Sequence, residues 1–216
     1  GRKKLLNMGK FLLRLFISLV VITISLVIYL SYFGIETDKF NSLIKGKTNE
    51  VNRNIKLDFE KTKIYLNYKE FNLIVKLQNP NFLIKNSKII LSKLDLFLPL
   101  SSFFNTNFLL KRAEVAFIEN DIKDLTKITN IFLPKIINKQ VNKIFHKGNL
   151  EGELIIPFES DGSIGKDYGF SGKVSEASIN FKKEFSIKKL TTEIKHVKVA
   201  GVDEFIITIE KGSIYD

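Results

Sequence analysis

The sequence predicts a mainly β protein with some α-helix. An N-terminal transmembrane helix should be followed by a curved antiparallel sheet that forms a groove, with one or two amphipathic helices. Two observations predict this fold class. Residues 15–34 carry no formal charge, and apolar and polar residues alternate with period two over much of the chain after residue 54. Helical spacing of apolar residues is confined to 36–54 and 121–147.

The uncharged stretch 15–34 reads LFISLVVITISLVIYLSYFG. As a helix, it would span about 30 Å, the thickness of the hydrocarbon core of a bilayer. Tyr29 and Tyr32 fall where an interfacial aromatic belt belongs, and the few Ser and Thr hydroxyls can bond back to the helix. A cleavable signal peptide would need a shorter apolar region and a small-x-small cleavage site. The sequence after residue 34 offers no such site, so we expect an uncleaved anchor.

The charges on either side of the span predict its orientation. Residues 1–14 carry five basic groups and no acid, whereas Glu36 and Asp38 are the first charged residues after the span. The positive-inside rule then places the N-terminus in the cytoplasm and the rest of the chain across the membrane. We therefore expect a single-pass protein with a basic cytoplasmic N-terminus.

The remaining chain divides into three parts. Residues 35–120 form a first β module that begins with a short membrane-proximal helix, 121–147 are a helical segment, and 148–216 form a second strand-rich module that looks truncated. In the second module the apolar parity changes at Ser175-Glu176, which predicts a bulge or a tight turn. Phe97 breaks the alternation of its strand and should face the other way.

The predicted sheet has more apolar surface than the two amphipathic helices can cover. Part of its apolar face should therefore line a groove, although each residue there also fits an ordinary hydrophobic core. The candidate lining residues are those on the apolar parity of the clearest strands: Ile55, Leu57, Phe59, Phe71, Leu73, Val75, Leu77, Leu94, Leu96, Leu98, Leu154, Ile156 and Phe158.

Both amphipathic helices carry side chains suited to a membrane surface. In the first, Phe40, Leu43 and Ile44 could enter the bilayer interface. In the second, a basic stripe recurs every four residues and could meet anionic headgroups; it equally fits the solvated face of a helix packed on the sheet. The stripe consists of Lys135, Lys139, Lys143 and Lys147.

Residues for catalysis or metal binding are sparse. Cysteine is absent, and His146 and His196 each lack neighbouring ligands at metal spacing. The segment 161–167 lacks the spacing and the final Ser or Thr of a Walker loop, so a hairpin loop fits it better. No nucleophile elbow or acid–base pair can be named. We expect no enzyme activity, no cofactor, no metal and no nucleic-acid partner.

Several features, in their order along the chain, resemble the AsmA-like family of bacterial envelope proteins, which includes YhdP and TamB. They are Lys-Phe-Leu-Leu-Arg-Leu-Phe (10–16) with the anchor, the short helix around 39–54, the segment LKRAEVAFIEN (110–120) and FSGKVSEASINF (170–181). The resemblance implies an inner-membrane anchor, a periplasmic body with an apolar β groove, and a role in phospholipid transport and outer-membrane biogenesis. Members of the family usually run to many hundreds of residues, so this chain of 216 would be a fragment or a reduced member.

The expected function is therefore lipid handling without a chemical step, with membrane phospholipids as partners. Acyl chains would lie along the apolar face while headgroups stay solvated at the open edge. The alternative is a non-enzymatic envelope scaffold or assembly protein that pairs with protein partners through its sheet edge.

Overall fold

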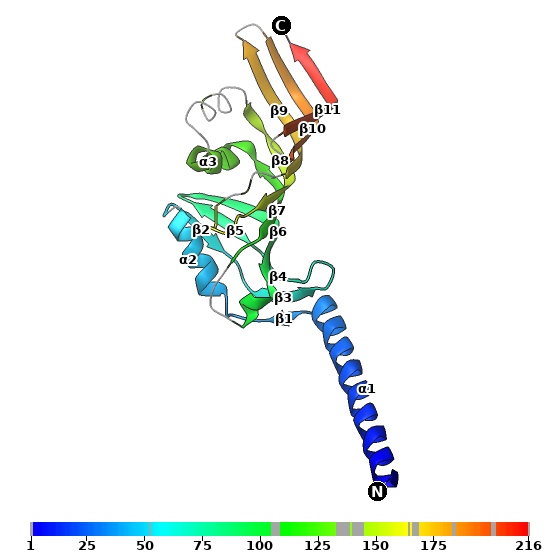
Figure 1. The fold of residues 1–216 in the computed structure, drawn as a ribbon. Coiled ribbons are helices and arrows are strands. Elements are labelled where there is room, and N and C mark those ends of the chain that lie inside the picture. Colours follow the sequence, from blue (N-terminus) through cyan, green and yellow to red (C-terminus); the bar gives the residue numbers. More distant parts are fainter. Residues whose placement is uncertain are drawn as a thin grey trace.

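The computed structural model describes residues 2–51, 53–104, 109–132, 139, 145–163, 165, 169–182, 185–199 and 202–215. Eleven strands form one open sheet, and every strand pair in this part of the chain is antiparallel (Figure 1). An apolar helix precedes the sheet, and two shorter helices pack against it. The predicted fold class is confirmed.

Helix α1 (Arg2–Tyr32) projects away from the sheet (Figure 1). Its stretch Asn7–Tyr32 is long and apolar enough to cross a membrane, with a mean hydropathy of 2.7 and no part buried in the protein. Two of its hydroxyls are satisfied within the helix: Thr23 Oγ1 donates to the Leu19 carbonyl and Ser25 Oγ to that of Val21, both at 2.8 Å. A helix needs such internal bonding where water is absent.

The sheet begins directly after α1 and runs in the order β1-β3-β4-β6-β7-β8-β9-β10-β11, while β2 and β5 form a branch from β6. The short helix expected over 36–54 is confined to α2, because β1 pairs with β3 before it. The elements of this first part are β1 (Ile35–Glu36), α2 (Asn41–Val51), β2 (Ile55–Asp58), β3 (Thr62–Asn67), β4 (Asn72–Leu77), β5 (Asn81–Ile84), β6 (Ser87–Pro99) and the 3₁₀ turn η1 (Leu100–Phe103).

Strand β6 joins two layers, because its first half pairs with β5 and its second half with β4. A register shift between Leu91 and Lys93 separates the halves. The buried positions accordingly change parity, from Ile89 and Leu91 before the shift to Leu94 after it. An inserted residue has this effect, since one step along a strand moves every following side chain to the other face.

The hydrophobic core lies between α2 and the two layers that meet at β6. Phe40 and Ile44 enter it from the helix side, and Val75, Ile89 and Leu98 are fully buried on the strands. Phe97 is buried on the opposite face of β6, as its parity predicts. Burying a side chain of this size contributes about 1.5–3 kcal/mol.

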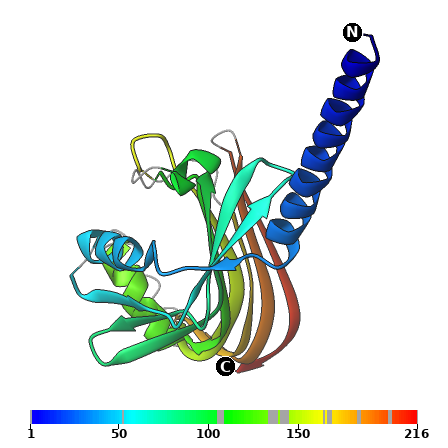
Figure 2. The same cartoon turned by 90° about the horizontal axis from the view of Figure 1, so that it is seen from below.

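The second part consists of β7 (Arg112–Asp121), α3 (Ile122–Phe132), β8 (Phe145–Pro157), β9 (Gly169–Lys182), β10 (Phe185–Val199) and β11 (Val202–Tyr215). Strands β8 to β11 pair as successive neighbours and curve together (Figure 2). At the parity change at Ser175-Glu176, Glu176 has φ 52 and the register with β8 shifts nearby. The predicted bulge is therefore present.

The helical segment expected over 121–147 is too long at its C-terminal end. Helix α3 covers Ile122–Phe132, whereas Phe145 and Lys147 already pair with Ile179 and Ser178 of β9. Backbone pairing along a long strand outweighs the helical spacing of the side chains there. Residues 133–138 and 140–144 lie outside the described part.

A buried amide compensates for an irregularity between β6 and β7. The β6–β7 ladder ends at the pair Leu91–Phe117, and the β7–β8 register shifts between Phe117 and Asn120. There the Asn120 side chain takes the place of a backbone partner for β6. Its Oδ1 accepts from the Ile90 N–H at 3.1 Å, and its Nδ2 donates to the Ile90 carbonyl at 2.9 Å. The side chain thereby continues the ladder where the backbone cannot.

Replacing Asn120 with Ala should lower the free energy of unfolding by about 1–3 kcal/mol, because both backbone groups of Ile90 lose their partner. Asn149→Ala is the control, since that side chain makes one bond to the exposed Glu119 and should cost about 0.5 kcal/mol. Urea unfolding in detergent, followed by circular dichroism, measures both. Equal losses in the two variants would contradict the role of Asn120.

Candidate functional site

Helix α1 and the sheet meet without an intervening linker. Helix α1 ends at Tyr32, and after Gly34 the chain pairs at once, Ile35 with Ile64 of β3. Gly34 has φ 67, and a Cβ there would lie 2.8 Å from the Ile64 carbonyl oxygen. Only glycine suits this conformation and this close approach. The sheet is therefore fixed directly to the end of the apolar helix.

Most of the predicted groove residues lie in the closed core of the first module. The buried ones pack under α2 and against one another, and they are Ile55, Leu57, Phe59, Leu73, Val75, Leu77, Leu94, Leu96 and Leu98. On β8 and after it, Leu154 and Phe158 are partly buried beside this core, and Ile156 is also partly buried. Phe71 lies apart from the others and is 75% exposed.

The apolar face of the core continues into the later strands. Leu94 pairs with Val115, Val115 with Leu154, and Leu154 with Phe170. Directly paired residues of neighbouring strands occupy the same face of a sheet. The row therefore extends the core-bearing face of β6 as far as β9.

Through the pairing of β9 with β10 and of β10 with β11, this face continues to the edge strand β11. Its rows run from Phe170 through His196 to Phe205, from Gly172 through Ile194 to Ile207, and from Val174 through Thr192 to Ile209. Among the described helices, α2 packs on β2, and α3 packs on β8, β7 and β6. Figure 1 shows β9, β10 and β11 extending beyond both helices, away from α1.

The residues expected at the bilayer surface, Phe40 just before α2 and Leu43 and Ile44 within it, face the sheet instead. Phe40 and Ile44 are each 4% exposed and belong to the core, and Leu43 packs against it. In this arrangement their side chains are covered by the protein. The neighbouring Lys45 lies over the Phe59 ring at 4.9 Å.

The predicted basic stripe does not lie on one helix. Lys139 is exposed in helical conformation, whereas Lys147 is exposed on strand β8. Lys135 and Lys143 lie outside the described residues.

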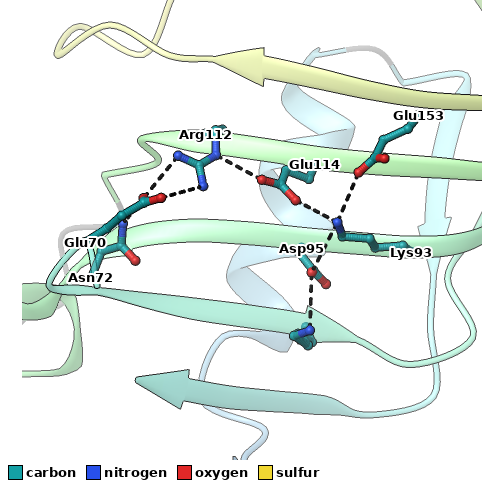
Figure 3. A network of polar contacts seen from close by, with 8 residues as sticks. Glu70, Asn72, Lys93, Asp95, Arg112, Glu114 and Glu153 are labelled. Carbon is teal, nitrogen blue, oxygen red and sulfur yellow. Dashed lines mark hydrogen bonds and ion pairs between the residues drawn. The ribbon is translucent and has the colours of Figure 1, made fainter. Parts of the chain in front are cut away.

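The face of the central strands opposite the core carries a network of charged side chains (Figure 3). Lys93 is its centre and lies 2.7 Å from Glu114 and 3.2 Å from Glu153. Arg112 bridges Glu114 and Glu70, each at 3.2 Å. The network ties β6, β7 and β8 to the turn before β4.

Two further contacts bury parts of this network. Asp95 is buried between Lys76 at 3.6 Å and Lys93 at 4.0 Å. The Arg112 guanidinium stacks on Phe97 at 3.9 Å from the ring centroid, which covers an aromatic side chain that faces away from the core. The stacking and the ion pairs together allow both faces of β6 to be buried.

The network shifts the pKa values of its members in different directions. Burial raises the pKa of the Asp95 carboxyl above 3.8, although Lys76 and Lys93 act in the opposite direction. Burial also opposes the charge of Lys93, but its hydrogen bonds to Glu114 and Glu153 outweigh this effect and raise its pKa above 10.5. The hydrogen bond from Arg112 lowers the pKa of Glu70. These groups pair with one another, as in a structural ion-pair network.

The sequence analysis did not find this network. In the sequence, the network shows only as the i, i+2 spacing of Lys93 with Asp95 and of Arg112 with Glu114, which puts each pair on one face of a strand. Only the register, Asp95 opposite Glu114, brings the two pairs together.

Other chemistry is sparse in the described part of the chain. No group of three or more His, Cys, Asp or Glu side chains there could hold a metal ion. In the segment after β8, Asp161 Oδ1 accepts from the Ser163 backbone N–H at 2.9 Å, and the Gly162 N–H donates to the Glu159 carbonyl. These contacts are those of a tight turn between strands.

No family model, no curated protein and no solved structure matches the chain.

Gly34→Ala should lower the free energy of unfolding by about 2 kcal/mol, because φ 67 is strained for Ala and the Cβ meets a backbone oxygen. Gly46→Ala in α2 is the matched control. Nothing lies within 4 Å of a Cβ at this position, so this variant should gain about 0.5–1 kcal/mol of stability. Urea unfolding in detergent gives both values. The same stabilisation in both variants would refute the constraint at Gly34.

Asp95→Asn should gain stability relative to the parent as the pH rises. The folded-state pKa of Asp95 is raised, so its contribution is fully present below the unfolded-state pKa and declines as pH rises through the folded value. The change is about 1.4 kcal/mol for each unit between the two pKa values. The measurement is urea unfolding of parent and variant from acidic to neutral pH. If the parent instead became more stable relative to Asp95→Asn as the pH rises, the raised pKa of Asp95 would be contradicted.

Proposed function

We propose that this protein is an inner-membrane-anchored periplasmic protein of the AsmA-like kind, which handles phospholipid for outer-membrane biogenesis. Acyl chains would lie on the apolar face of strands β9 to β11. The observation that carries the proposal is the set of cross-strand rows that continue the core-bearing face to β11, beyond the strands on which α2 and α3 pack.

The closed core of the first module favours the later strands as the lipid site. There α2 and the layer of β2 and β5 already cover the apolar face, and Val75 and Leu98 are fully buried. An acyl chain needs a face that the protein does not fill. Burying about ten methylenes of an acyl chain on such a face would contribute about 8 kcal/mol to binding. Binding of this kind involves no chemical step.

The attachment of the sheet to the anchor also supports transport away from the membrane. Strand β1 begins two residues after Phe33, and the sheet order then leads from β1 at the anchor to β11 at the other edge. The basic residues before the span and the acidic ones after it favour a body outside the cytoplasm.

A second candidate function is that of an envelope scaffold that binds partners by strand addition. Strand β11 has 14 residues and, in the described part of the chain, pairs with β10 alone. A long edge strand presents unpaired backbone groups to another strand. This function would leave the apolar face without lipid.

Ile207→Lys should remove most of the phospholipid that co-purifies with the full chain, because it places a charge on the proposed lipid face. Ile206→Lys is the matched control, since this neighbouring residue lies on the other face and is exposed. Mass spectrometry of lipid in the detergent-purified proteins measures the effect, with circular dichroism to check folding. Equal lipid in folded parent and Ile207→Lys would exclude this lipid face. Crosslinks from β11 to a protein partner would then favour the scaffold.

A further inference from the structure

The hairpin between β3 and β4 carries exposed aromatic side chains at its tip. Tyr68 is exposed and Phe71 is 75% exposed. Phe71 also has φ 52, a left-handed conformation in which Gly or Asn is ordinarily found. A large apolar residue that is both strained and exposed stabilises neither the turn nor the core. Such a residue points to a contact outside the folded chain.

Further apolar side chains lie at the same end of the sheet. Asn72 pairs with Pro99, so the residues that follow Pro99 begin beside Phe71. The 3₁₀ turn η1 contacts β4 there. The exposed members of this region are Leu100 on η1, Phe104 directly after it at 87% exposed, and Leu109 before β7. Exposed apolar residues from three separate segments thus lie at this end of the sheet.

This area lies on the α1 side of the sheet. Strand β1 runs from α1 towards α2, and β3 runs antiparallel to it, so β3 leads back towards α1 and ends at the hairpin tip. Helix α1 contacts β3, and both views show the hairpin beside the end of α1 that joins the sheet (Figures 1 and 2). The last residues of the anchor are aromatic and exposed as well: Tyr29, Tyr32 and Phe33.

The charge of the area is basic. Lys69 and Lys111 are exposed. The one acid of the hairpin tip, Glu70, accepts from Arg112 at 3.2 Å and from Asn72 at 3.1 Å, so its charge is balanced within the protein. Aromatic side chains flanked by lysines suit the boundary between acyl chains and anionic headgroups.

We propose that these segments form a membrane-contact surface that lies on the interface of the bilayer spanned by α1. The surface consists of Tyr68, Lys69, Phe71, Leu100, Phe104 and Lys111, and its partner is the phospholipid leaflet around the anchor. The continuity of the surface with the aromatic end of α1 identifies this partner. The surface requires only that α1 lies in a bilayer and is independent of lipid transport. With α1 it gives the body two attachments and so fixes the tilt of the sheet relative to the membrane.

The absence of Trp from the chain permits a direct test with single-Trp variants. Phe71→Trp and Phe104→Trp are made in the full protein and reconstituted into vesicles of phosphatidylcholine and phosphatidylglycerol. Ile206→Trp, an exposed apolar position on β11, is the control for the body, and Leu19→Trp is the control for the anchor. Brominated phosphatidylcholine in the same vesicles quenches a Trp that touches the bilayer.

We expect the emission of the Trp residues at 71, 104 and 19 to shift to shorter wavelength and to lose most of its intensity, while that at 206 is unchanged. Quenching at 19 without quenching at 71 and 104 would overturn the proposal. A blue shift at 71 that depends on protein concentration and not on bromolipid would assign the surface to a second copy of the chain, and would also overturn it. If the Trp at residue 19 is not quenched, α1 does not lie in the bilayer, and both the anchor and the membrane-contact surface are excluded.

A second variant separates membrane contact from stability. Phe71→Asn suits the left-handed position, so it should leave the free energy of unfolding unchanged or raise it. In the Phe104→Trp background it should reduce quenching at residue 104, because the surface loses one of its insertion points. Quenching at 104 that is the same with and without Phe71 would show that the two segments do not act as one surface.

Discussion

An antiparallel sheet with one apolar face must cover that face or place it against something other than water, and this requirement shapes most of the molecule. In the first module the requirement is met within the chain. The sheet branches at β6, where β5 and β2 continue from its first half and β4 and β3 from its second, and side chains of both branches join Phe40 and Ile44 in one core. In the second module the same face continues over long strands, while α3 packs on β6, β7 and β8. The difference between the two modules is the basis for placing lipid on the second.

The opposite face of the central strands meets the same requirement with charge. Asp95 and Phe97 lie on this face of β6, and both are buried, one by lysines and the other by the Arg112 guanidinium. The long stems of Lys and Arg cover apolar surface while their charged ends pair with Glu70, Glu114 and Glu153. Exposed ion pairs contribute little individually, whereas Asp95 and Arg112 are held in a partly desolvated arrangement. This network keeps β6, β7 and β8 in register on the side that no described helix covers.

The junction at Gly34 relates the sheet to the apolar helix α1. Because β1 begins without a linker, the direction of α1 and the direction of the first strands are set by the same few residues. The end of β3 that leads to the hairpin, with Phe71 exposed, therefore lies beside α1, whereas α2 lies at the other end of β1. The membrane-proximal role that the sequence indicated for α2 falls instead to the hairpin and η1 in our proposal.

The apolar helix, the antiparallel sheet, the reversed side of Phe97 and the bulge at Ser175-Glu176 could be predicted from the sequence, because each depends on local periodicity and composition. Which of the apolar residues are core could not be predicted in this way, since it depends on how the strands pack. The patterns of Leu73 and Leu154 are alike in sequence, but Leu73 is buried in the core, whereas Leu154 is only partly buried at its margin. The ends of the helical segment and the charged network also depend on register with distant strands, as in the pairing of Lys147 with Ser178. Burial and register arise from contacts between residues far apart in the chain, so local patterns of polarity do not contain them.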